Sequence, residues 1–151
     1  MATDQDFTIG VEEEYLIIDP ATRELRQRAN VVLPKARRIV GNEVTNELFQ
    51  SQIEVGTPVC RTLADVRAEL TRLRGAVVEA ARKAKSRIAA AGTHPFSHWG
   101  EQHITPKQRY HELARDFQQL TREQIICGCH VHIGIADREA AVQVMNRARP
   151  W

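Results

Sequence analysis

The chain has 151 residues, a net charge of +2 and 42% hydrophobic residues, values that fit one globular domain or part of a larger one. A net charge this small, with scattered basic residues, gives no reason to expect a nucleic-acid partner. No apolar run is long enough to span a membrane, and the polar N-terminus is unlike a signal peptide. We therefore expect no membrane partner and a cytoplasmic location.

The first predicted element is a strand over residues 8–19, which ends at the turn sequence Asp-Pro-Ala-Thr. It carries three consecutive carboxylates, Glu12, Glu13 and Glu14, although like charges repel and buried unpaired ions are costly. Because side chains alternate along a strand, Glu12 and Glu14 share one face while Glu13 points away. The pattern fits a Mg²⁺ or Mn²⁺ site, and it also fits an exposed edge strand with solvated glutamates.

A short helix beginning near Pro34 is predicted next, and a second strand follows over residues 43–55. Its alternation places Gln52 and Glu54 on one polar face, like the glutamates of the first strand. Glu47 falls on the opposite face by strict alternation, so a bulge would be needed to bring it in.

The clearest helix is predicted over residues 62–85, where Thr62 and Asp65 resemble a capping box ahead of an apolar stripe. A short strand at 87–91 leads into a long loop, 92–106, rich in His, Pro and Gly, which is a candidate functional segment. Three elements complete the chain: a helix over 106–120, a strand over 123–135, and a helix capped by Asp137.

The strand at 123–135 places His130 and His132 on one face, with Gly128 and Gly134 leaving room beside them. His-x-His also occurs in zinc hydrolases, but Gly134 and Ile135 stand where the metallo-β-lactamase motif has its later ligands. A metal-dependent hydrolase is therefore the alternative interpretation. The nearby Cys-x-Cys lacks a second cysteine pair at zinc-finger spacing, which favours reduced thiols that pack on the strand.

Four segments, taken together and in order, resemble the glutamate–cysteine ligase type 2 family, also called YbdK-like carboxylate–amine ligases. They are TIGVEEEYLIID at 8–19, ELFQSQIEVGTPVC at 47–60, AGTHPFSHW at 91–99 and CGCHVHIGI at 127–135. The resemblance implies an α+β fold similar to the catalytic domain of glutamine synthetase, with a curved, largely antiparallel sheet and helices on one face. Residues 1–151 would form the N-terminal portion of a single such domain.

The activity implied by the resemblance is an ATP-dependent ligase that uses Mg²⁺ or Mn²⁺ and serves glutathione biosynthesis. ATP would phosphorylate a carboxylate, such as the γ-carboxylate of glutamate, and an amine such as cysteine would displace phosphate from the acyl phosphate. Matched position by position, the metal-binding and catalytic residues are Glu12, Glu14, Glu54 and His130. Weaker matches give substrate-binding roles to Glu47 and Gln124, and His94 is a candidate active-site loop residue.

Family members are more than twice as long as this chain, and the resemblance places further metal and phosphate ligands in their later part. We therefore expect residues 1–151 to be inactive alone, and either to form a homo-oligomer or to associate with the remaining portion. A non-catalytic remnant that binds no metal is a further alternative. The sequence does not choose the amine acceptor.

Overall fold

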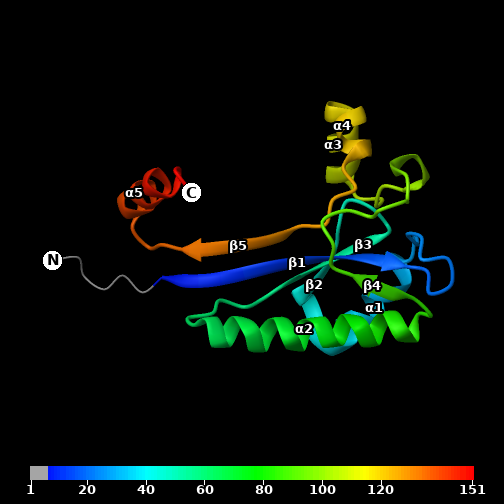
Figure 1. The fold of residues 1–151 in the computed structure, drawn as a ribbon, viewed down its shortest axis with the longest axis horizontal. Coiled ribbons are helices and arrows are strands. Elements are labelled where there is room, and N and C mark those ends of the chain that lie inside the picture. The colour runs from blue at the N-terminus through cyan, green and yellow to red at the C-terminus, as the bar shows by residue number, and fades with distance from the viewer. Residues whose placement is uncertain (1–6) are drawn as a thin grey trace.

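The computed structural model describes residues 7–151, and its centre is a sheet built around one long strand (Figure 1). That strand, β1 (Thr8–Ile18), pairs along one edge with β3 (Gln52–Gly56), which pairs in turn with β2 (Val44–Asn46). Its other edge is shared by β4 (Arg87–Ala89) and β5 (Cys129–Gly134), each beside a different half of β1. Every one of these pairings is antiparallel, which confirms the predicted sheet. The N-terminal residues 1–6, used above to argue against a signal peptide, lie outside the described residues.

Two helices, α1 (Ala29–Val40) and α2 (Leu63–Lys83), cover one face of the sheet (Figure 1). The predicted capping box begins α2, since the hydroxyl of Thr62 accepts from the amide of Asp65 and the Asp65 carboxylate accepts from the amide of Thr62. This face contains the main core, in which apolar side chains of both helices meet those of the sheet. Its largest fully buried members include Tyr15, Ile17, Val32, Val44, Ile53, Val55, Leu73 and Val77.

The remaining helices occupy other positions around the sheet. A 3₁₀ helix (Gly41–Glu43) links α1 to β2, and a second one (Trp99–Glu101) lies in the long loop after β4. The helices α3 (Gln108–Phe117) and α4 (Gln119–Glu123) stand on the side of the sheet opposite α2 (Figure 1). The last helix, α5 (Arg138–Ala148), follows β5 at the end of the sheet that is farthest from α3. No helix among the described residues is both long enough and apolar enough to cross a lipid bilayer.

The second predicted strand, 43–55, is wrong as a single element, because the chain reverses within it. β2 and β3 form an antiparallel pair in which Thr45 lies opposite Glu54. The intervening backbone turns to meet the later loop: the amide of Thr105 donates to the carbonyl of Leu48 at 2.8 Å, and Phe49 bridges Ile104. Alternation of polar and apolar residues continues through this reversal, so the sequence pattern does not reveal it.

Three other predicted boundaries also differ from the structure. The first helix begins at Ala29 rather than near Pro34, because buried side chains such as Val32 attach its first turn to the core. The predicted helix 106–120 is divided at Gln118, whose positive φ of 43° ends α3. The predicted strand 123–135 is regular only over β5, since residue 123 still belongs to α4.

Candidate active site

The three consecutive glutamates of β1 point to two different faces of the sheet, as the alternation predicts. Glu13 points toward the helices, where the guanidinium of Arg74 on α2 pairs with its carboxylate at 2.5 Å. Glu14 lies on the other face, in register with Glu54 of β3, and Glu12 lies there in register with His130 of β5. This second face, away from α1 and α2, therefore gathers the candidate ligands from three strands.

A cluster of three carboxylates forms on this face, from Glu14, Glu47 and Glu54. One oxygen of each lies within 4.8 Å of one oxygen of both others. Glu14 is buried, and the other two are partly buried. The turn between β2 and β3 brings Glu47 to this face, so its inclusion depends on the chain reversal rather than on a bulge. The amide of Gly128 donates to Glu14 Oε2 at 2.9 Å, which fixes the orientation of that carboxylate.

The electrostatics of this acidic cluster favour a bound cation. Burial raises the pKa of Glu54, and the negative charges of Glu12, Glu47 and Glu14 raise it further. Burial likewise raises the pKa of Glu47, with the amide of Leu48 opposing the shift. Three partly dehydrated carboxylates at this spacing offer the oxygen ligands that Mg²⁺ or Mn²⁺ prefers, and such an ion would relieve their repulsion.

Beside the acidic cluster, Glu12 contacts two imidazoles. Its Oε2 atom lies 3.0 Å from Nε2 of His132 and 3.4 Å from Nδ1 of His130. The hydrogen bond from His132 is the largest influence on Glu12, and the pKa of this carboxyl is lowered. Gly128 sits between the two groups, because a Cβ atom there would lie 3.2 Å from both Glu14 Oε1 and His130 Nε2. His130 therefore faces Glu12 with one ring nitrogen and the acidic cluster with the other.

The four predicted ligands thus fall into two neighbouring groups on one face of the sheet. Glu14 and Glu54 join Glu47 in the acidic cluster, whereas Glu12 and His130 form the adjacent group with His132. Among the described residues, the three carboxylates are the group whose ligand atoms meet within metal-binding distance. The metal-binding roles of these residues stay predictions.

A pocket of about 250 Å³ opens onto this acidic cluster. Gln124 lines it, together with two residues of α3 that the sequence did not suggest, Arg109 and Tyr110. Burial raises the pKa of Tyr110 to about 12, and its hydroxyl donates to the carbonyl of Asn46 at 3.1 Å. Nothing local to α3 marks these side chains as functional, since only the packing of α3 beyond the sheet brings them to the carboxylates. The pocket therefore combines acidic, amide, phenol and guanidinium groups.

His94 lies away from the acidic cluster and stabilises the loop that contains it. Its Nε2 atom bonds the carbonyl of Arg23 at 2.9 Å, and its Nδ1 atom accepts from the amide of Ser97 at 3.1 Å. It lines a separate hollow of about 360 Å³ beside β4, which shares no lining residue with the acidic pocket. The structure thus does not bring His94 together with the other predicted site residues.

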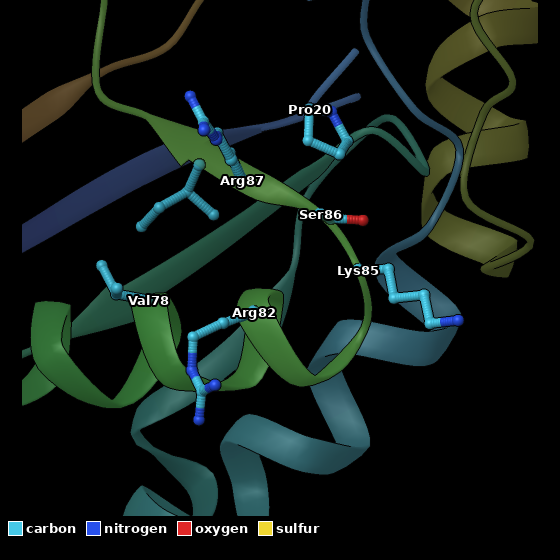
Figure 2. Close-up of a pocket in the computed structure, with 7 residues that line it drawn as sticks. Pro20, Val78, Arg82, Lys85, Ser86 and Arg87 are labelled. Carbon is cyan, nitrogen blue, oxygen red and sulfur yellow. The ribbon is translucent and has the colours of Figure 1, made fainter.

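Among the described residues, no cysteine belongs to the acidic cluster, and a further hollow lies away from it. All three cysteines are free thiols, and Cys127 donates to the backbone carbonyl of Glu14 at 3.0 Å. Figure 2 shows a hollow of about 450 Å³ between α2 and β4, on the side of the sheet that the helices cover. Its charged lining residues, Arg82, Lys85 and Arg87, are all basic. The acidic cluster is consequently the part of the described chain with metal-ligand chemistry.

Comparison with known proteins places this sequence in a family. The family described as glutamate–cysteine ligase family 2 (GCS2) matches residues 8–151. The chain belongs to this family. Its relatives include proteins named "Putative glutamate–cysteine ligase 2" from Herpetosiphon aurantiacus, 49% identical over 143 residues, and from Roseiflexus castenholzii, 47% identical over 146 residues. These matches cover 95% and 97% of this chain, but only 37% and 38% of the two relatives.

Solved structures support the same fold at low sequence identity. A glutamate–cysteine ligase from Francisella tularensis, solved in complex with AMP, aligns with a TM-score of 0.70 and 13% identity. A bifunctional glutathione synthetase from Pasteurella multocida aligns with a TM-score of 0.66 and 16% identity. Each alignment covers 97% of this chain, and 30% and 19% of the two proteins respectively. The antiparallel sheet with its helices is therefore a fold that this chain shares with part of each of these two proteins.

Proposed function

We propose that this chain supplies the metal-binding face of an ATP-dependent carboxylate–amine ligase, similar to a glutamate–cysteine ligase. The observation that carries the proposal is the acidic cluster of Glu14, Glu47 and Glu54, with Glu12 and His130 beside it, in a member of this family. Phosphoryl transfer depends on holding the triphosphate and neutralising its charge, and divalent ions held by carboxylates do both.

The residue roles follow from the two groups of ligands. Glu14, Glu47 and Glu54 would hold one Mg²⁺ or Mn²⁺ through carboxylate oxygens, and the bound ion would stabilise negative charge on the phosphates of ATP. Glu12 and His130 would contact a second cation or a phosphate at the edge of the acidic cluster. Gln124, in the adjacent pocket, would bind substrate as an amide donor or acceptor. Glu47 thereby moves from the predicted substrate role to a proposed metal ligand.

The proposed chemistry proceeds through an acyl phosphate. A carboxylate oxygen of the substrate, such as the γ-carboxylate of glutamate, attacks the terminal phosphorus of ATP, and ADP leaves. The amine of the second substrate, such as cysteine, then attacks the acyl carbon, and inorganic phosphate leaves with the C–O bond electrons. The amine loses one proton as the amide forms. The described residues would orient the first step, because their charges face the pocket where phosphates would lie.

The metal part of the proposal is tested by Mn²⁺ binding to residues 1–151. We expect binding that Glu14→Gln weakens at least tenfold, because one charged ligand of a buried cluster is lost. Glu139→Gln, in the first turn of α5, is the matched control and should bind Mn²⁺ as the unchanged chain does. Absence of Mn²⁺ binding by the unchanged chain would favour a non-catalytic remnant.

The ligase part is tested by phosphate release from ATP in the presence of glutamate and cysteine. We expect no turnover by residues 1–151 alone, because this chain matches only 37% of the length of the Herpetosiphon relative. Turnover should appear when the remaining portion of the Herpetosiphon relative is added or fused. Amide or ester hydrolysis without ATP, dependent on His130 and His132, would instead support the hydrolase alternative.

A further inference from the structure

We propose that Arg74 is a positioning residue for the metal site, although it lies on the opposite face of the sheet. The proposal rests on the metal site proposed above. It starts from Glu13, which stands between the two candidate ligands Glu12 and Glu14 in the chain. Its carboxylate faces the helices and is almost completely buried.

The contacts of Glu13 form a two-sided clamp between β1 and α2. Arg74 approaches both carboxylate oxygens, with Nη2 at 2.5 Å from Oε1 and Nε at 3.3 Å from Oε2. The hydroxyl of Tyr15 donates to Oε2 as well. A bidentate guanidinium–carboxylate pair restricts direction as well as distance, so this contact fixes the orientation of β1 relative to α2.

The position of β1 in turn determines where the candidate ligands lie. Glu12 and Glu14 are the covalent neighbours of Glu13, and a shift or rotation of the strand at Glu13 moves both. Glu14 must stay aligned with Glu54, its partner across the β1–β3 pair, for the acidic cluster to keep its spacing. Ligand geometry of this kind depends on the groups that support it, and their removal typically weakens metal binding about 10- to 100-fold.

Without Arg74, Glu13 would be a buried carboxylate that has lost its cationic partner, which is strongly unfavourable. A hollow of about 390 Å³ beside Glu13, Tyr15 and Arg74 gives the strand room to adjust. Movement of Glu13 toward this hollow would pull Glu12 and Glu14 away from their own partners. The geometry of the site therefore depends on α2, although α2 lies on the opposite face of the sheet.

The test compares Mn²⁺ affinity with stability for matched variants of residues 1–151. Arg74→Met should weaken Mn²⁺ binding at least tenfold. Arg82→Met is the control, because Arg82 lies on the same helix in an exposed pair with Glu79, and it should change Mn²⁺ affinity less than twofold. The double variant Glu13→Gln/Arg74→Met removes the unpaired charge, so it should recover most of the stability that Arg74→Met loses. Its Mn²⁺ binding should remain at least fivefold weaker than that of the unchanged chain.

The outcomes separate this inference from the function on which it rests. Mn²⁺ affinity of Arg74→Met within twofold of the unchanged chain overturns the clamp. Full recovery of affinity in the double variant also overturns it, since Arg74 would then act only by neutralising charge. If Arg74→Met does not fold, the double variant alone decides between these results. An unchanged chain that binds no Mn²⁺ overturns the proposed metal site, and the clamp with it.

Discussion

The two regions of the chain differ in how they are held together. Residues 7–90 contain the main core, in which side chains of α1 and α2 are fully buried against β1, β2 and β3. In residues 91–151, the described helices α3 and α5 and strand β5 contain no buried residue. This second region is attached through the β1–β5 pairing, a small cluster around Phe49 and Ile125, and hydrogen bonds to the turn between β2 and β3.

The candidate site lies at the boundary between these regions. Its carboxylates come from the well-packed first region, whereas His130 and His132 come from β5, whose residues are all exposed. On the helix-side face of β5, Val131 and Ile133 are 63% and 51% exposed, which is unusual for apolar strand residues. The acidic half of the site is thus supported by a core, whereas the imidazole half lies on an exposed strand that pairs with β1.

The largest expected effect comes from a cavity in the first core. Leu73→Ala should lower the free energy of unfolding by about 2–5 kcal/mol, because Leu73 is fully buried. Met145→Ala on α5 should change it by less than about 0.5 kcal/mol, since Met145 is exposed. Urea unfolding followed by circular dichroism measures both. Similar losses in the two variants would show that the second region contributes equally to stability.

Metal binding should stabilise the boundary between the regions. At a free Mn²⁺ concentration of about 100 times its dissociation constant, the free energy of unfolding should rise by about 2.7 kcal/mol. Hydrogen exchange should slow in β1 and β3, which carry Glu14 and Glu54. Glu54→Gln should reduce both effects, while Glu112→Gln on α3 serves as the exposed control. Slower exchange confined to α5 would place the ion elsewhere.

A smaller effect is expected at the start of α2. Thr62→Ala should cost about 1 kcal/mol, because the capping hydrogen bond to the amide of Asp65 is lost. Thr71→Ala is the matched control on the same helix, where the hydroxyl bonds only the carbonyl of Arg67 one turn earlier. Equal losses of stability in Thr62→Ala and Thr71→Ala, measured by thermal unfolding, would argue against a distinct contribution from the capping box.

The same capping box gives a pH dependence of defined sign. Hydrogen bonds from Thr62 and from the amide of Arg61 lower the pKa of Asp65 below its ordinary value. A carboxylate whose pKa is lower in the folded state stabilises the protein above its unfolded pKa, and this stabilisation is lost as the pH falls. Asp65→Asn should therefore flatten the acid side of the stability profile. An unchanged profile would contradict this assignment.

The smallest effect on stability is expected on β5. Replacing Val131 and Ile133 by Thr should change the free energy of unfolding by less than about 0.5 kcal/mol, because both side chains are exposed. Self-association should nevertheless decrease, since the apolar surface becomes more polar. Sedimentation velocity measures this directly. A loss of stability without a change in association would show that these side chains already pack within the folded chain.

Much of the first region could be predicted from the sequence, because its signals are local. Alternation placed Glu12 and Glu14 opposite Glu13, and the capping box located the start of α2. Alternation did not reveal the turn that brings Glu47 into the acidic cluster. That turn depends on pairing between Phe49 and Ile104, which are far apart in the sequence.

The contacts of the two imidazoles could not be predicted from the sequence, for a different reason. The pattern predicted that His130 and His132 share one face, but it did not predict which carboxylate they contact. Gly10 lies opposite His132 and has no side chain, so the His132 ring is free to turn toward Glu12. Such diagonal contacts depend on the register between strands, which alternation within one strand does not contain.

Gly128 has a consequence for saturation mutagenesis of this chain. Its backbone lies outside the left-handed region, so an alternative residue would meet no conformational barrier there. The restriction is one of space, because even a methyl group would lie 3.2 Å from both Glu14 Oε1 and His130 Nε2. In a library selected separately for solubility and for metal retention, we expect small residues at position 128 to survive the first selection and only glycine the second.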